Sequence, residues 1–185
     1  MIHSPLEVSM EHQILSRETV FKGHAFNVEK LQVRLPDGRE REYDLVSHKD
    51  SVTIIPFDTD GNIWFVSQFR MGCECQLLEL PAGVMDGGES PESCAAREVR
   101  EETGFAAGKL TMLGSVYLAA GYSSEINHVF LAEDLVESPL AMDEDEFLNV
   151  HSFPVTKVWE LVDKGEIMDS KSLAALLLAK NHLNP

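Results

Sequence analysis

The chain has 185 residues, of which 44% are hydrophobic and 25% are charged, and its formal net charge is −16 at pH 7. This length suits one domain with a substantial core, and the composition argues against a disordered or fibrous protein. The negative charge disfavours extended nucleic acid and anionic membrane as partners. A small anionic substrate stays compatible if arginines or a metal ion supply local positive charge.

Neither a secretory signal nor a membrane span is predicted. The longest apolar runs, such as residues 173–179, are too short to cross a bilayer, and the N-terminus lacks a basic stretch followed by an apolar core. We therefore expect a cytoplasmic protein. Three cysteines, Cys73, Cys75 and Cys94, are too few for a disulfide framework. We interpret the Cys73-x-Cys75 pair as two reduced thiols near a strand, because no second Cys/His pair follows at zinc-ligand spacing.

The N-terminal region is predicted to form a hairpin preceded by a loosely held arm. Residues 1–16 are polar and irregular, and residues 19–35 read as one strand that is broken at Gly23. A Pro-Asp-Gly turn at 36–38 then leads into a second strand over 40–47. We expect residues 1–48 to be an arm with a β-hairpin and residues 49–185 to be the main domain.

The main domain is predicted to mix strands and helices without regular alternation. Strands are expected at 51–57, 62–69, 110–118, 127–132 and 147–153, and helices at 91–103, 156–164 and 171–181. Strands outnumber helices, and the two types do not alternate. This pattern favours the α+β class, with a mixed sheet and helices packed on its faces.

Residues 83–105 specify a loop, a helix and a second loop. The glycines in Asp86-Gly87-Gly88 suit a tight turn because glycine tolerates positive φ. Ser90 is expected to cap the helix, and Pro91 fits its first position because proline has no amide hydrogen to satisfy. Gly104 is expected to end the helix in the left-handed conformation.

The helix carries three glutamates on one face. At about 100° per residue, Glu98, Glu101 and Glu102 fall within one arc, and Arg97 lies four residues before Glu101. Such a stripe is often a solvated acidic face. Like charges at this spacing repel, however, and a divalent cation would relieve that repulsion. Hard carboxylate oxygens suit Mg²⁺ or Mn²⁺.

The segment resembles the Nudix box, G-x5-E-x7-R-E-U-x-E-E-x-G-U, at every fixed position: Gly83, Glu89, Arg97, Glu98, Val99, Glu101, Glu102, Gly104 and Phe105. The resemblance implies an α/β/α sandwich around a mixed β-sheet that hydrolyses a nucleoside diphosphate linked to another group. It also implies that Glu98, Glu102 and the backbone carbonyl of Ala82 bind Mg²⁺, which Mn²⁺ can replace. Glu101 would have a metal or supporting catalytic role, and Arg97 would orient a glutamate of the box.

Flanking segments resemble the ADP-ribose and nucleotide-sugar pyrophosphatase branch of that family. Residues 68–70 and 78–83 are similar to its Q-Y-R and L-E-L-P-A-G sequences, and residues 118–125 are similar to its S-P-G-x-S-x-E loop. The substrate-binding residues that this implies are Arg70, Val84, Gly121 and Glu125. Arg70 can also be read as a surface arginine, and Glu79 as either a supporting acid or a solvent-facing strand residue.

The substrate is expected to be a nucleoside diphosphate sugar, with ADP-ribose first. Ala120 stands where ADP-ribose pyrophosphatases usually have proline, so GDP-mannose or another nucleotide sugar is the alternative. A non-catalytic nucleotide sensor is the alternative of a different class, although this chain keeps every carboxylate of the box. The N-terminal strands resemble those that build a homodimer in this branch.

The acidic run at residues 143–146 is expected to complete the site. In the resembling enzymes such a loop supplies the general base and a further metal ligand, and these positions map to Glu144 and Glu146. A solvated loop is the alternative. The implied reaction is attack by water, deprotonated by Glu144, on one phosphorus. A nucleoside monophosphate and a sugar phosphate would be released.

Overall fold

The computed structural model describes residues 11–141 and 147–183. The chain divides into two compact units, which are Met1–His48 with Ala119–Ser124, and Lys49–Leu118 with Glu125–Pro185. Within the described residues, no helix is long and apolar enough to cross a membrane. Each unit is described by itself below.

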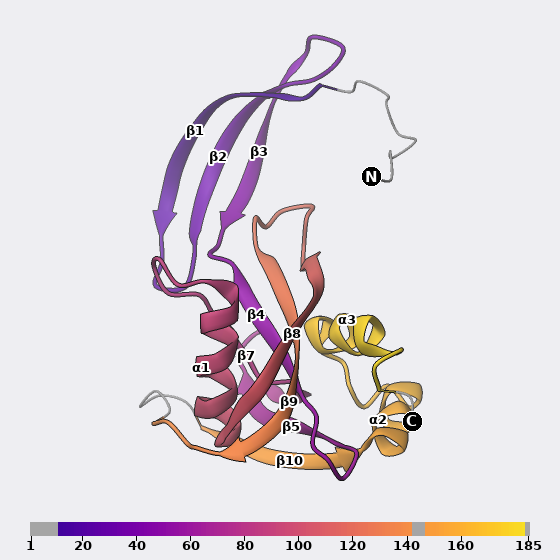
Figure 1. Ribbon diagram of the computed structural model, residues 1–185. Coiled ribbons are helices and arrows are strands. Elements are labelled where there is room, and N and C mark those ends of the chain that lie inside the picture. Colours follow the sequence, from indigo (N-terminus) through magenta and orange to yellow (C-terminus); the bar gives the residue numbers. More distant parts are fainter. Residues whose placement is uncertain (1–10, 142–146, 184–185) are drawn as a thin grey trace, which may run out of the picture. The chain divides into compact units, whose positions relative to one another are not determined.

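The first unit contains a three-stranded antiparallel sheet in the order β1-β2-β3 (Figure 1). Its strands are β1 (Gln13–Lys22), β2 (Asn27–Arg34) and β3 (Glu40–Ser47). The hairpin between β2 and β3 is confirmed, with Gly38 at φ 84° in its turn. The segment 119–124 pairs with the end of β3, where the Val46 N–H donates to the Tyr122 carbonyl at 2.7 Å.

The prediction of one strand over residues 19–35 is wrong, because the chain reverses in its middle. The Gly23 N–H donates to the Phe26 carbonyl at 3.0 Å, and a Cβ at Gly23 would lie 2.6 Å from that same oxygen. Only glycine fits so tight a turn without displacing the backbone. The first strand also begins at Gln13, inside the segment that was expected to be an irregular arm.

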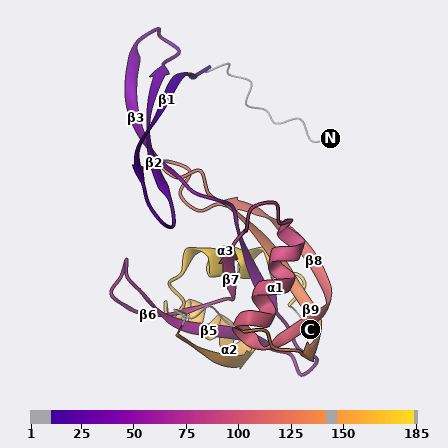
Figure 2. The ribbon, with the colours of Figure 1, turned by 90° about the vertical axis from the view of Figure 1, so that its left-hand side faces the viewer.

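The second unit contains two sheets and three helices (Figures 1 and 2). One sheet is mixed, with the order β7-β4-β9-β8 and β4 parallel to β9, and the other is antiparallel, with the order β10-β5-β6. The strands are β4 (Ser51–Pro56), β5 (Asn62–Arg70), β6 (Cys75–Glu79), β7 (Ala82–Val84), β8 (Phe105–Tyr117), β9 (Ile126–Glu137) and β10 (Leu148–Pro154). The helices are α1 (Pro91–Thr103), α2 (Val155–Asp163) and α3 (Ser170–Ala179). The expected α+β class with a mixed sheet and helices is confirmed.

Two hydrophobic cores lie in the second unit. Val99 of α1 packs with Val52, Ile54 and Phe130 of the mixed sheet. Residues of α2 and α3 pack with Phe65 and other residues of β4, β5 and β9 in the larger core. Alternate residues of β4 therefore face different cores, which is why all six residues of this strand are buried. This fully covered strand holds β7 and the loop that follows it against α1.

Candidate active site

The helix α1 begins and ends where the sequence predicts. The Ser90 Oγ accepts a hydrogen bond from the Ser93 N–H at 3.1 Å, and Pro91 occupies the first turn. Gly104 has φ 81°, and its N–H donates to the Arg100 carbonyl at 3.1 Å. These two caps fix the rotation of the helix and thereby the direction in which its glutamates point.

Two of the three glutamates on one face of α1 are buried against β7. Glu98 is 7% exposed and Glu102 is 2% exposed, which excludes a solvated face for both. The Ala82 N–H donates to Glu102 Oε2 at 3.3 Å. A Cβ at Gly83 would overlap with the carboxylate of Glu98, so this close approach requires glycine. The box glycine and the box glutamates therefore form one packed unit.

Arg97 joins three carboxylates of the same segment. Its guanidinium donates to both oxygens of Glu89 at 3.1 and 3.0 Å, to Glu98 at 2.6 Å and to Glu101 at 2.8 Å. The hydrogen bond from Arg97 lowers the pKa of Glu89 to about 2, although partial burial of Glu89 opposes this shift. The same hydrogen bond raises the pKa of Arg97. Arg97 thus holds these three carboxylates in fixed positions.

The donor set around β7 fits a hard divalent cation. It consists of two buried carboxylates, Glu98 and Glu102, beside the backbone of Ala82, which are the oxygen ligands that Mg²⁺ and Mn²⁺ prefer. Among the residues that the structure describes, no three His, Cys, Asp or Glu side chains form a group that could hold a metal ion. Two carboxylates with a carbonyl leave coordination positions that water, substrate phosphate or a further ligand would fill.

Arg70 on β5 and Glu79 on β6 form a bidentate salt bridge. Arg70 Nε and Nη2 donate to the two oxygens of Glu79 at 2.7 and 2.6 Å. Glu79 is 1% exposed, so the solvent-facing alternative is wrong for this residue. Burial raises the pKa of Glu79, but the hydrogen bond from Arg70 and the charge of Lys171 outweigh it and lower the pKa overall. The hydrogen bond to Glu79 is the main cause that raises the pKa of Arg70, and the charge of Glu102 adds to it, so this pair lies within the field of the α1 glutamates.

Lys171 is a member of this network that sequence reasoning did not single out. Its Nζ lies 2.5 Å from Glu79 Oε2 and 3.0 Å from Asp169 Oδ1, and its side chain is 14% exposed. Asp169 also caps α3, since it accepts from the Ser172 N–H at 3.0 Å. A lysine in the first turn of a helix is ordinary in a sequence, and no pattern marks it as a partner for a glutamate on β6.

Glu125 is held by a chain of two buried polar side chains. Ser51 Oγ donates to Glu125 Oε1 at 2.7 Å, and Asn127 Nδ2 donates to Ser51 Oγ at 2.9 Å. Ser51 is 5% exposed and Asn127 is fully buried. Sequence reasoning missed Ser51 and Asn127 as site residues. The available signal was two polar residues at the start of strands that are otherwise apolar.

The other two predicted substrate residues, Val84 and Gly121, lie in different units of the chain. Val84 ends β7 and is 43% exposed, and its carbonyl lies 3.5 Å from Arg97 Nη2. Gly121 belongs to the first unit, within the segment that pairs with β3. Nothing within 4 Å would contact a Cβ at Gly121, so its position does not depend on close packing.

The predicted base Glu144 and the predicted ligand Glu146 lie outside the described residues. The segment that leads towards them is anchored to the end of α1. Arg100 donates to the carbonyl and hydroxyl of Ser138 at 3.0 and 3.2 Å, and the Ser138 N–H donates to the Gly104 carbonyl at 2.8 Å. The residues that precede the acidic run therefore lie beside the last turn of α1, which also carries Glu102.

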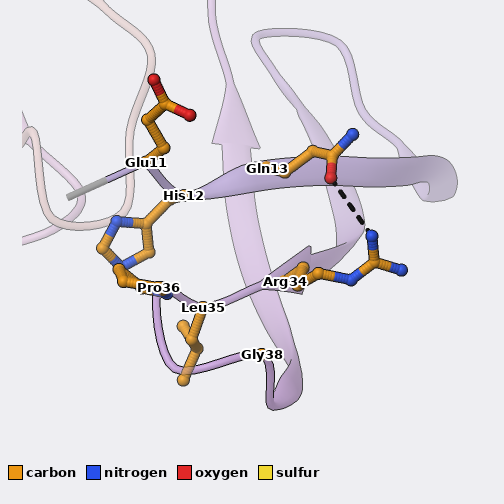
Figure 3. A pocket seen from close by; sticks show the side chains of 7 residues that line it. All are labelled: Glu11, His12, Gln13, Arg34, Leu35, Pro36 and Gly38. Atoms are coloured by element: carbon orange, nitrogen blue, oxygen red, sulfur yellow. Dashed lines mark hydrogen bonds between the residues drawn. The ribbon is translucent and has the colours of Figure 1, made fainter. Parts of the chain in front are cut away.

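Two surface cavities are found among the residues that the structure describes. A cavity of about 670 Å³ in the first unit is lined by residues 11–13, 34–36 and Gly38, and Arg34 there donates to Gln13 at 3.3 Å (Figure 3). A cavity of about 370 Å³ lies in the second unit beside α1 and β8, with Arg97, Arg100 and Leu140 in its lining. The first cavity contains none of the predicted site residues. The second contains Arg97 and ends at the segment that precedes residues 142–146.

Comparison with known proteins identifies the fold and its relatives. Residues 47–176 match the family described as NUDIX domain. The chain is 36% identical over 170 residues to "ADP-ribose pyrophosphatase" of Bacillus subtilis (strain 168), covering 91% of this chain and 92% of that one. It is 33% identical over 132 residues to "GDP-mannose pyrophosphatase" of Yersinia enterocolitica serotype O:8 / biotype 1B (strain NCTC 13174 / 8081), covering 66% and 69%. A solved structure described as "Crystal structure of ADP compounds hydrolase" matches with a TM-score of 0.84 at 29% identity, covering 94% of each chain.

Proposed function

The chain belongs to the NUDIX family and is a pyrophosphohydrolase of nucleoside diphosphate sugars, and from this premise we propose that ADP-ribose is its preferred substrate and Mg²⁺ its metal ion. The products would be AMP and ribose 5-phosphate. The observation that carries the proposal is the burial of Glu98 and Glu102 against β7, where Glu98 lies so close to the backbone that only glycine fits at position 83. The similarity to an ADP-ribose pyrophosphatase over 91% of the chain supports the choice of substrate.

We propose that Glu98, Glu102, the Ala82 carbonyl and Glu146 hold the metal ion. When bound, a divalent ion neutralises the pyrophosphate charge that repels nucleophiles. Arg97 orients Glu98 and Glu101 through hydrogen bonds of 2.6 and 2.8 Å. The acidic run follows Ser138 in the sequence, and Ser138 is anchored to α1. Glu144 would then remove the proton from the attacking water, and Glu144→Gln should lower kcat.

Arg70 is proposed to bind a phosphate of the substrate. A guanidinium has five N–H donors, and Glu79 accepts from two of its nitrogens. The Arg70 side chain is 40% exposed, whereas its carboxylate partner is buried. The salt bridge thus fixes the plane of the guanidinium while donors stay available towards solvent, which suits recognition of phosphate by a preoriented arginine. Val84, Gly121 and Glu125 are proposed as further substrate contacts.

The metal assignment is tested with three variants of one helix. Glu98→Gln and Glu102→Gln should each lower Mg²⁺-dependent kcat/KM for ADP-ribose by about 100-fold or more, because each removes a charged ligand. Glu92→Gln is the matched control, since Glu92 is an exposed glutamate in the first turn of α1. Mn²⁺ binding followed by titration calorimetry should weaken in the first two variants only. Full turnover in either of these, or equal losses in all three, would contradict the assignment.

GDP-mannose is the second candidate substrate, because the chain is also 33% identical to a GDP-mannose pyrophosphatase. A panel of ADP-ribose, ADP-glucose, GDP-mannose and UDP-glucose with Mg²⁺ separates the two proposals. A higher kcat/KM for ADP-ribose supports the first, and a higher value for GDP-mannose replaces it. Tight binding of one of these compounds without any turnover would identify a nucleotide sensor instead.

We propose that a second copy of the chain covers the first sheet. Large apolar residues on β1 are exposed, including Val20 at 46% and Phe21 at 54%, whereas only Leu31 and Val33 of this sheet are buried hydrophobic residues. A three-stranded sheet with so small a core is marginal in water. Light scattering should give twice the chain mass, and Phe21→Asp should shift it towards the monomer. A monomeric parent protein would refute the homodimer.

A cytoplasmic location is also proposed. The three cysteines Cys73, Cys75 and Cys94 are free thiols, and free thiols persist in reducing compartments. Cell fractionation tests this location, and recovery of the protein in an extracellular fraction would contradict it.

A further inference from the structure

Cys73 and Cys75 bring their thiols together in the turn between β5 and β6. Their Sγ atoms lie 3.1 Å apart, with the Cys75 thiol donating to the Cys73 sulfur. Cys73 is exposed and Cys75 is partly exposed, so small reagents can reach the pair. The turn belongs wholly to the second unit.

This contact depends on the backbone of Glu74. Residues two apart in an extended strand are separated by about 7 Å and their side chains run parallel, which is too far for sulfur contact. Glu74 has φ 53°, a left-handed conformation that non-glycine residues seldom adopt. This kink shortens the separation of the two residues, so their sulfur atoms come within 3.1 Å of each other. A disulfide needs an S–S distance of about 2.05 Å, so closure requires the sulfur atoms to approach by roughly 1 Å.

We propose that Cys73 and Cys75 are a modification site, a dithiol that peroxide-class oxidants convert to a disulfide within the turn and that thiols reopen. The Cys73 thiolate attacks hydrogen peroxide, so an S–O bond forms, the O–O bond breaks and water leaves. The Cys75 sulfur then loses its proton and attacks the Cys73 sulfur, forming the S–S bond and releasing a second water. Two thiols and one peroxide thus give one disulfide and two waters.

The turn that contains Cys73 contacts the backbone of Arg70. Oxidation of the two cysteines should therefore affect the position of this proposed phosphate-binding residue. The Cys73 N–H donates to the Arg70 carbonyl at 3.2 Å, and the Cys73 Sγ contacts the same oxygen at 3.5 Å. Cys75 is the strand partner of Arg70 in the β5–β6 ladder. Contraction of the turn therefore pulls on the backbone that carries the guanidinium. This consequence for activity rests on the proposed function, whereas the thiol chemistry does not.

Cys94 provides an internal control for thiol reactivity. It is fully buried, and burial raises the pKa of its thiol to about 12, so it stays protonated and inert near neutral pH. Any thiols lost on mild oxidation of the native protein should therefore be those of the turn.

To test the proposal, the full-length protein is oxidised with hydrogen peroxide, and its free thiols are counted and its mass is measured. The native protein should lose two thiols and about 2 Da without forming covalent dimers, and dithiothreitol should restore both. Peptide mapping should place the link between Cys73 and Cys75. Cys73→Ser and Cys75→Ser should abolish the loss of 2 Da, whereas Cys94→Ser should retain it. Sulfinic acid, intermolecular disulfides or unchanged thiols would each overturn the proposal.

The activity arm measures ADP-ribose hydrolysis before and after oxidation. The KM should rise severalfold and return with dithiothreitol, while Cys73→Ser should be insensitive to oxidation. An internal disulfide without any change in KM would refute the coupling to Arg70 and leave the modification site standing. Absence of hydrolysis in the reduced protein would instead refute the proposed function, because the thiol count does not depend on it.

Discussion

The two units of this chain differ in what stabilises them. The second unit contains both hydrophobic cores, and the buried carboxylates near α1 and β6 are joined in hydrogen-bonded networks. The first unit is a sheet whose strand β1 is exposed at all ten positions. Its ion pairs, such as Arg34–Glu40 at 3.0 Å, lie on the surface, where each contributes about 0–1 kcal/mol.

This difference shows where chemistry can be placed in the fold. A catalytic carboxylate has to be held within a fraction of an ångström, and this requires packed neighbours on several sides. Glu98 and Glu102 have such neighbours because β7 is pinned by the buried strand β4. The first sheet has no comparable packing on its own, so it can hold a functional side chain in place only if another surface covers it. The following predictions test this contrast.

Gly83→Ala should have the largest effect. The added Cβ would overlap with the Glu98 carboxylate, which must move together with the proposed metal site. We expect kcat/KM for ADP-ribose to fall by about 100-fold or more, since displacement of a ligating group has effects comparable to its removal. Gly87→Ala is the control, because nothing lies within 4 Å of its Cβ position. Steady-state kinetics that show equal losses in both variants would contradict the packing argument.

Two phenylalanines compare the stability of the units directly. Phe65→Ala removes a fully buried ring from the core of the second unit and should lower the free energy of unfolding by about 3–5 kcal/mol. Phe21→Ala removes a ring that is 54% exposed and should cost less than about 1 kcal/mol in the monomeric chain. Denaturant unfolding with far-UV detection measures both. A cost for Phe21→Ala that equals the cost for Phe65→Ala would mean that β1 is buried in solution.

The sequence predicts best where local chemistry decides the structure. The cap at Ser90, the proline after it and Gly104 place α1 at the observed residues, because each satisfies or ends the helix through its own backbone. The match to the NUDIX box likewise identifies the family, since its fixed residues report one packed unit. The positions of Glu144 and Glu146, in contrast, stay predictions because they lie outside the described residues.

The sequence predicts poorly where contacts join distant segments. In the sequence, the reversal at Gly23 looks like a break within one strand, because β-rich residues on both sides of a turn resemble one continuous run. Lys171 reaches Glu79 across 92 residues, and Asn127 reaches Ser51 across 76 residues. No local periodicity marks such pairs, so they appear only once the strands and α3 have been placed.

Ser51→Ala should have a smaller effect that falls on binding. Ser51 is a positioning residue, since it connects buried Asn127 to Glu125. Its loss should raise the KM for ADP-ribose about 3- to 10-fold with little change in kcat, because one hydrogen bond that orients Glu125 is lost. Ser67→Ala is the matched control, since Ser67 is a strand serine bonded to His151 at 2.9 Å in the other sheet. A loss in kcat alone, or equal changes in both variants, would contradict the positioning role.

The smallest expected effect is on the acid stability of the second unit. The folded-state pKa of Glu89 is lowered to about 2 by Arg97, so the ionised form stabilises the fold above the unfolded-state pKa. This stability is lost as the pH falls from about 4.5 towards 2, when the carboxylate is protonated. Glu89→Gln should therefore lower the Tm at pH 7 by a few degrees at most and flatten its decline below pH 4.5, because the pair is partly exposed. Glu40→Gln, in the surface pair of the first sheet, should leave the acid profile unchanged. Parallel acid profiles for native protein and Glu89→Gln would contradict this prediction. They would mean that the Glu89–Arg97 pair contributes no pH-dependent stability beyond the pairs of Arg97 with Glu98 and Glu101.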